Sequence, residues 1–265
     1  MGRQGLPEFL NLPRKPLCQC SRSCPRPPLP GEPWCEFHKK NLDQKTRSSK
    51  SCQKGPLSGS EPKRNLSAWN DNKDLKESHN CFSYAMNVLD PELIKKCKET
   101  IRCNVGFHQP GYASGHGYFP DKHNKACIDM VSRLWGDNPD VKVTRFETQC
   151  PYNTSKIALI VDPKRDYHFI RQDSDGTWSH KPGAMDVTTL DASGRPIIRP
   201  DRALFLYKHK KDPLMYTKMC GYYCVPRNKP LYLMNDARRE GGAIVSRGSS
   251  LRRVTRRKSR DVSHQ

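Results

Sequence analysis

The sequence predicts an α+β fold in which short helices come first and a meandering antiparallel sheet follows. Apolar residues recur at helical spacing in two stretches, 81–89 and 123–135. The continuous apolar run at 156–162 is typical of a buried strand. A turn at Asp173–Gly176 then separates two strand-like stretches, which predicts a hairpin over 167–181. Helices and strands that are segregated along the chain in this way favour α+β over α/β.

The helix that begins at Cys81 is the best defined element. Asn80 precedes it and is a good N-cap, because its side-chain oxygen can accept an orphan backbone N–H of the first turn. The helix ends before Pro91 and is expected to bury one apolar face. That face consists of Phe82, Ala85, Met86 and Leu89.

The remaining elements follow in chain order. A second short helix is expected at 92–102, and the Gly-rich stretch 109–117 is expected to form a loop that walls a substrate site. Further strands are expected at 141–143, 186–188, 196–198 and 222–226.

The formal charge of +20 is concentrated toward the two ends of the chain. Residues 1–64 carry 13 Lys and Arg against 5 Asp and Glu, and residues 236–265 carry 9 against 3. Basic ends of this kind suit a polyanion such as nucleic acid or an anionic membrane surface. We therefore divide the chain into a basic arm at 1–40, a flexible linker at 41–68, an α+β domain at 69–235 and a disordered basic tail at 236–265.

The 12 cysteines are expected to be reduced. The sequence holds no run of 18 apolar residues, so no membrane span is expected, and the N-terminus lacks the apolar core of a signal peptide. An intracellular, reducing location, not a secreted one, follows from this. Metal ligands, a catalytic thiol and structural core thiols are then expected in place of disulfides. The core thiols are Cys97, Cys103, Cys127 and Cys150, and Cys220 with Cys224 is a poor metal pair.

A zinc site is predicted near the N-terminus. Cys20, Cys24, Cys35 and His38 have spacing that suits tetrahedral zinc, and Cys18 could replace Cys20. Few apolar residues lie between them, so the metal would have to hold this segment together. The pattern resembles small Cys/His knuckles at the front of several large-DNA-virus proteins.

A candidate catalytic group centres on Cys81. Its place at a helix start favours a thiolate, because the positive end of the helix dipole lies there. His168 is the predicted base and His180 the residue that orients it. Asp173 and Gln172 are alternatives for the third role. A blander reading is that Cys81 is an ordinary buried thiol and His180 a solvated strand residue.

These motifs resemble the NlpC-type branch of papain-like cysteine peptidases, in which a cysteine begins a helix and two polar residues lie on adjacent strands. His79–Ala85, Gln109–Gly111 and the run His168–Gly183 are also similar to uncharacterised proteins of giant DNA viruses. The resemblance covers about residues 69–230. It implies a papain-like domain with an antiparallel sheet and a peptide or amide substrate.

The predicted function is a thiol hydrolase that cleaves peptide, isopeptide or amide bonds and needs no cofactor for catalysis. The alternative is a non-catalytic virion protein, either minor capsid or internal, whose basic ends bind capsid partners, membrane or nucleic acid. Either reading places the protein in the host cytoplasm or the virion. The predicted non-specific contacts to a polyanion lie in the tail, at Arg252, Arg253, Arg256, Arg257, Lys258 and Arg260.

Overall fold

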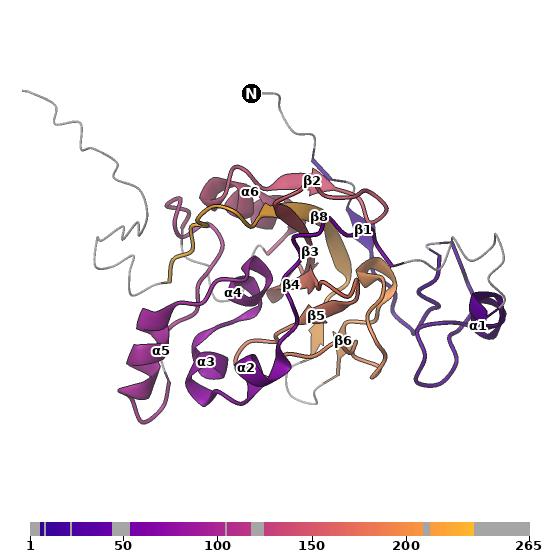
Figure 1. Cartoon of the computed structure of the whole chain (residues 1–265), viewed down its shortest axis with the longest axis horizontal. Coiled ribbons are helices and arrows are strands. Elements are labelled where there is room, and N and C mark those ends of the chain that lie inside the picture. Colours follow the sequence, from indigo (N-terminus) through magenta and orange to yellow (C-terminus); the bar gives the residue numbers. More distant parts are fainter. Residues whose placement is uncertain are drawn as a thin grey trace, which may run out of the picture.

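A computed structural model describes residues 6–7, 9–21, 23–43, 54–103, 105–117, 125–208 and 213–235 (Figure 1). The helices are α1 Glu36–Asp43, α2 Leu66–Asn70, α3 Lys73–Ser78, α4 Cys81–Met86, α5 Pro91–Lys98 and α6 Cys127–Asp137. The strands are β1 Leu10–Asn11, β2 Lys142–Thr144, β3 Thr154–Asp162, β4 Asp166–Gln172, β5 Trp178–His180, β6 Leu206–Tyr207, β7 Leu214–Met215 and β8 Lys218–Pro226. A short 3-10 turn covers Pro200–Arg202.

Side-chain caps set the starts of the early helices. Asn72 caps α3, Asn80 caps α4 and Asp90 caps α5, each accepting hydrogen bonds from backbone N–H groups of the first turn. Helix α4 ends at Asn87, whose φ of 56° is left-handed, a conformation that asparagine tolerates better than most residues. Leu89 differs from the prediction, because it lies beyond the helix and is 56% exposed.

The central sheet has the order β1-β8-β3-β4-β5, and β2 pairs with β8 beyond β1 on the same edge. All of these pairings are antiparallel, which confirms the predicted α+β class. Strand β8 pairs with three other strands: with β3 along one edge, and with β1 and β2 along the other. The predicted hairpin is the pair β4–β5, with Ile170 opposite His180.

The sheet separates two hydrophobic cores. On one face, α4 and α6 pack against side chains of β3, β4 and β8; this core includes Cys81, Phe82, Tyr167 and Phe169. The opposite face carries a second core that includes Ile170 and Phe205 and is covered by loops rather than by helices. In Figure 1 helix α4 lies beside β4, helices α2, α3 and α5 lie below it, and α1 lies apart from them on the right.

The stretch 54–65 is not the flexible linker that its composition predicts. Gly55 and Glu61 are buried, and the Gln172 side chain donates a 2.7 Å hydrogen bond to the carbonyl of Gly55. Ser58 likewise donates to the carbonyl of Thr154 on β3. The backbone of this Gly/Ser/Pro-rich stretch finds partners on the domain surface, so composition alone gave the wrong answer. Residues 44–53 of the predicted linker lie outside the described residues.

Three disulfides between described cysteines contradict the expectation of reduced core thiols. Cys127–Cys220 joins α6 to β8, and Cys150–Cys224 joins the segment after β2 to β8. Cys97–Cys103 closes a short loop after α5. The paired cysteines are 93, 74 and 6 residues apart, in the order given above, and no local spacing motif predicts any of the pairs.

The predicted intracellular, reducing location is therefore wrong. Disulfides persist in oxidising compartments and are rare in the reducing cytosol, so three of them indicate an oxidising, extracellular environment. Among the helices that the structure describes, none combines the length and the apolar character that a bilayer crossing requires.

We predict that the two long-range disulfides carry most of the covalent stabilisation. In the chain-entropy account, closing a loop of 93 residues contributes roughly 4–5 kcal/mol and closing one of 6 residues about 2 kcal/mol. The Cys127→Ala/Cys220→Ala variant should thus lose more unfolding free energy in guanidinium than the Cys97→Ala/Cys103→Ala variant. An equal or larger loss in the Cys97/Cys103 variant would contradict the assignment.

Candidate metal centre and the predicted catalytic residues

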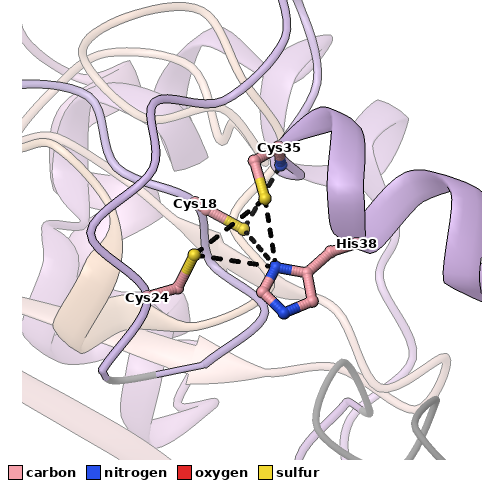
Figure 2. A group of neighbouring side chains, drawn as sticks. All are labelled: Cys18, Cys24, Cys35 and His38. Atoms are coloured by element: carbon pink, nitrogen blue, oxygen red, sulfur yellow. Dashed lines mark hydrogen bonds between the residues drawn. The ribbon is translucent and has the colours of Figure 1, made fainter.

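The N-terminal segment folds into a small knuckle that gathers three thiols and one imidazole. Cys18 and Cys24 come from the irregular chain before α1, Cys35 immediately precedes that helix, and His38 lies on its first turn (Figure 2). A turn at Gly31, with φ of +69°, helps bring Cys35 back toward Cys18. All four side chains are buried, although few apolar residues surround them.

The distances fit a tetrahedral metal. His38 Nδ1 lies 3.3 Å from Cys18 Sγ, 3.7 Å from Cys24 Sγ and 3.1 Å from Cys35 Sγ. With metal–sulfur bonds of about 2.3 Å and metal–nitrogen bonds of about 2.0 Å, the edges of a tetrahedron are roughly 3.6 Å between S and N. Cys24 and Cys35 are 3.9 Å apart, far beyond the roughly 2.05 Å of a disulfide. This cluster of Cys18, Cys24, Cys35 and His38, the knuckle site, could bind a metal ion.

Cys20 is not part of the knuckle site. It takes part in a disulfide, so its sulfur is not available as a thiolate ligand. Cys18, the predicted alternate, occupies the fourth position instead. Sequence spacing could not separate the two, because they are only two residues apart.

The knuckle is fastened to the sheet domain by two side chains. Gln19 is 1% exposed; its Oε1 accepts from the amides of Ile198 and Arg199, and its Nε2 donates to the carbonyl of Pro196. From the domain side, the Arg202 guanidinium donates to the carbonyls of Cys18 and Cys24. Two of the four possible ligands thus have their backbones held by the domain.

A second group, Glu77 with Cys97 and Cys103, also brings three potential ligand atoms together. Its two sulfurs are bonded to each other in a disulfide, however, and a disulfide offers no thiolate to a cation. The Cys97–Cys103 disulfide therefore closes the loop after α5.

Cys81 lies at the start of α4 as predicted, but its environment opposes a thiolate. The side chain is 5% exposed and packs in the core between α4 and the sheet. Burial raises the pKa of the Cys81 thiol to about 12, and this outweighs the lowering by backbone N–H groups nearby. The helix has only six residues, and its positive end does not offset the loss of solvent.

His168 and His180 are brought together, on the face of the sheet opposite Cys81. His180 Nε2 donates to the carbonyl of Leu190, so its Nδ1 accepts from His168 Nε2 at 2.8 Å. His168 packs on the ring of Tyr216 and His180 on that of Phe205, which both belong to the loop-covered core. Neighbouring residues on a strand point to opposite faces. Tyr167 and Phe169 share the core of Cys81, so His168 between them points to the other face. The structure thus does not assemble Cys81 with its predicted base.

Burial fixes these histidines in the neutral form. It lowers the pKa of His180 to about 4 and that of His168 well below its usual value, where the His180 charge adds to the effect. A neutral pair joined by one hydrogen bond, and ending on a backbone carbonyl, is a satisfied core network.

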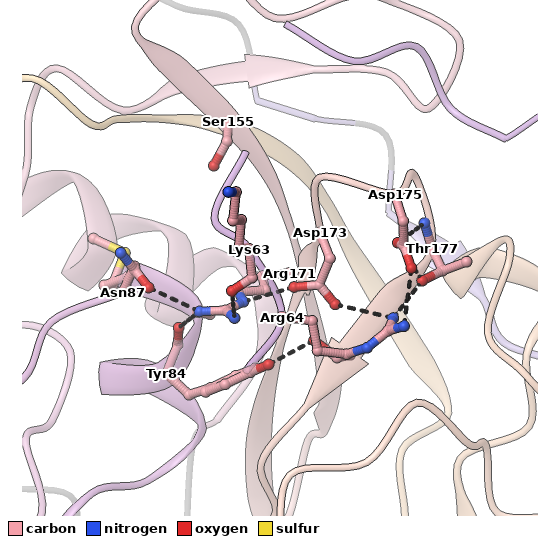
Figure 3. Close-up of polar contacts among 12 residues, drawn as sticks. Lys63, Arg64, Tyr84, Asn87, Ser155, Arg171, Asp173, Asp175 and Thr177 are labelled. Carbon is pink, nitrogen blue, oxygen red and sulfur yellow. Dashed lines mark hydrogen bonds and ion pairs between the residues drawn. The ribbon is translucent and has the colours of Figure 1, made fainter. Parts of the chain in front are cut away.

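The alternative third residues, Gln172 and Asp173, serve the packing of the hairpin. Gln172 binds Gly55 as described above. Figure 3 shows the Arg171 guanidinium between Asn87 and Asp173, and Arg64 between Asp173 and Asp175. The carboxylate of Asp173 thus lies between two arginines under the hairpin turn, and Asp175 supplies the second negative charge. These ion pairs give a structural explanation for the polar residues in the hairpin part of the run His168–Gly183.

Sequence reasoning missed a second buried polar cluster beside α4. His108 Nε2 lies 3.1 Å from Asp90 Oδ2, and its Nδ1 lies 3.0 Å from Ser83 Oγ. His79 Nε2 accepts from the backbone N–H of Asp90 at 2.9 Å. The four side chains are buried, so they join α4, α5 and the 105–117 loop rather than face a substrate. From the sequence, Asn80 is predicted only as a helix cap and His79 belongs only to the resemblance motif, so this cluster has no separate sequence signal.

The predicted polyanion-binding residues, Arg252 to Arg260, lie outside the described residues.

We predict that Cys81 is unreactive in the folded protein. A pKa of about 12 leaves roughly one thiol in ten thousand ionised at pH 8, and the side chain is shielded from solvent. Iodoacetamide at pH 8 should label Cys81 only in denaturant, as peptide mass spectrometry would show, and His168→Ala should not change the rate. Rapid labelling in mild acid that His168→Ala abolishes would instead support the thiol-hydrolase prediction.

Comparison with known proteins connects the chain to a matrix protein. No family model and no solved structure matches it. The chain is 36% identical, over 133 residues, to insoluble matrix shell protein 1 of Ruditapes philippinarum. The matched region covers 49% of this chain and 72% of the relative. At that identity and coverage, the chain belongs to the family of insoluble matrix shell protein 1.

Proposed function

We propose that the chain is a structural component of an extracellular matrix. The observation that carries the proposal is the double disulfide attachment of β8, through Cys220 and Cys224, in the middle of the sheet. Covalent ties on a strand that already pairs with three others suit a protein that must persist outside the cell. The name of the relative, an insoluble matrix shell protein, favours an extracellular matrix over a virion.

The geometry around Cys81 favours this role over hydrolysis. A thiol hydrolase needs a thiolate within hydrogen-bonding reach of its base. Here Cys81 and His168 belong to the cores on opposite faces of the sheet, and burial raises the thiol pKa. A papain-like arrangement of these residues stays a prediction from the resemblance alone.

We further infer that the metal of the knuckle site is zinc. Three thiolates and one neutral imidazole in a closed, buried group are the donor set of structural zinc sites. Burial lowers the pKa of His38, which keeps the ring neutral and able to bind. When bound, zinc would supply the cross-links that a hydrophobic core supplies elsewhere. The hydrogen bonds of Gln19 and Arg202 would then connect the ordered knuckle to the segment 196–202.

We predict that removing zinc loosens both the knuckle and its attachment. Purified oxidised protein should hold about one zinc per chain by elemental analysis, and His38→Ala should lose it, whereas Cys81→Ser should keep it. Chelation should speed hydrogen exchange at the amides of Ile198 and Arg199, which Gln19 caps, without changing that of Phe169 on β4.

Absence of zinc from protein purified without chelators would contradict the assignment. So would equal exchange at Ile198 and Arg199 before and after chelation. An unchanged Phe169 serves as the internal control, because its strand is paired on both sides within the sheet.

The partner that best fits the charge is a sulfated or carboxylated matrix polysaccharide. The chain has a net charge of +20, and residues 246–265 carry seven Lys and Arg against one Asp. Acidic polysaccharides are the extracellular polyanions that a chain of this charge would attract. The affinity should fall as the salt concentration rises. Under this proposal, the predicted polyanion contacts of the tail would form with a matrix polysaccharide outside the cell.

We predict that deletion of 246–265 lowers the salt concentration at which the oxidised protein elutes from immobilised sulfated polysaccharide. The reason is that fewer counterions are released when fewer basic residues bind. Neutral agarose serves as the control matrix. An unchanged elution position would contradict a role for the tail, and retention on immobilised DNA alone would favour the nucleic-acid reading.

A further inference from the structure

Two tripeptides in the described part of the chain match the acceptor pattern for N-linked glycosylation. They are Asn65-Leu66-Ser67 and Asn153-Thr154-Ser155. An N-x-Ser/Thr triplet with no proline in the middle is modified only in proteins that enter the secretory route. The three disulfides between described cysteines indicate that this chain folds in an oxidising compartment. The two triplets are therefore candidate glycosylation sites, which they would not be in a cytosolic protein.

Asn65 has the geometry of an accessible acceptor. It lies just before α2, and residues 65–68 are all exposed. Its Oδ1 caps the helix, accepting from the amide of Ala68 and from the hydroxyl of Ser67 at 3.0 Å each. Within the described residues, no hydrogen bond uses its Nδ2, which is the atom that a glycan would occupy.

A glycan at Asn65 is compatible with the fold. N-glycosylation replaces one hydrogen on Nδ2 and leaves Oδ1 as an acceptor, so the cap on α2 would survive. A bulky, hydrated group also needs an open surface, and the first turn of α2 provides one. In Figure 1, α2 lies on a different part of the molecule from α1 and the knuckle, so a glycan there would leave the knuckle uncovered.

The triplet that begins at Asn153 is less accessible than the one that begins at Asn65. Its φ of +62° places it in a left-handed turn, and its side chain is half-buried. Ser155, the third residue of this triplet, is fully buried and its hydroxyl accepts from Arg227 Nε at 2.6 Å. The folded chain thus engages the hydroxyl at this triplet, whereas Ser67 is exposed.

We propose that Asn65 carries an N-linked glycan. In the reaction, Asn65 Nδ2 forms a bond to C1 of the sugar on a lipid-linked oligosaccharide. The bond from C1 to the pyrophosphate oxygen breaks, the lipid pyrophosphate leaves, and the amide gives up one proton. The transfer needs an oligosaccharyltransferase and no oxidant. The inference rests on the extracellular role proposed above, since only the secretory route supplies the donor.

The test uses the full chain, secreted from a eukaryotic host behind a cleavable signal. Peptide-N-glycosidase in heavy-oxygen water should convert Asn65 to labelled aspartate, as peptide mass spectrometry would show. Asn65→Asp keeps the helix cap but lacks the amide, and Ser67→Ala keeps Asn65 but breaks the triplet, so both should abolish the label. The matched control, Asn153→Gln, should leave the Asn65 glycan intact.

Disulfide mapping of the same sample separates the two proposals. An unmodified Asn65 in protein whose Cys127–Cys220 bond has formed overturns the glycan and leaves the matrix role standing. Modification at Asn153 alone overturns the assignment to Asn65. Secreted protein in which Asn65 is unmodified and Cys127 and Cys220 remain thiols counts against both.

Discussion

The structure depends on strand β8 more than on any other element. Its nine residues pair with β3 along one edge and with β1 and β2 along the other, and two of them form disulfides. At Gly221, with φ of +126°, a Cβ would lie 2.9 Å from Pro7, so only glycine lets the N-terminal segment pack across this strand. Strand β8 thus joins the N-terminal arm, helix α6 and the segment after β2 into one unit.

A sheet that is buried on both faces also explains why the catalytic prediction failed. In a strand with one wet face, polar and apolar residues alternate and show which side chains point inward. Strand β4 is buried on both sides, so Tyr167, His168, Phe169 and Ile170 give no such alternation. The sequence could place a histidine on a strand and a cysteine on a helix start. It could not show that the strand directs the histidine away from that helix.

Features decided within a few residues were predictable, and those decided across the chain were not. Asn80 and the Asp173–Gly176 turn determine their local backbone directly, so the helix start and the hairpin were found. The disulfide pairs depend on how distant elements pack, since the two that involve β8 join residues 93 and 74 positions apart. Residues 54–65 look like a linker in the sequence because their hydrogen-bond partners, such as Gln172 and Thr154, lie about 100 residues further along the chain. Of the four predicted zinc ligands, three join the knuckle site, and the fourth was confused with a near neighbour.

The coexistence of disulfides with free thiols is the last constraint that the fold must satisfy. In an oxidising compartment, an accessible thiolate exchanges with disulfides, so each thiol that stays reduced needs protection. Three of the free cysteines in the described part of the chain, Cys18, Cys24 and Cys35, share the knuckle site, where a bound metal would block their oxidation. Cys81, also free, is protected differently, because burial both hides it and raises its pKa. A thiol that survives beside disulfides in this way is explained by its burial and requires no catalytic role.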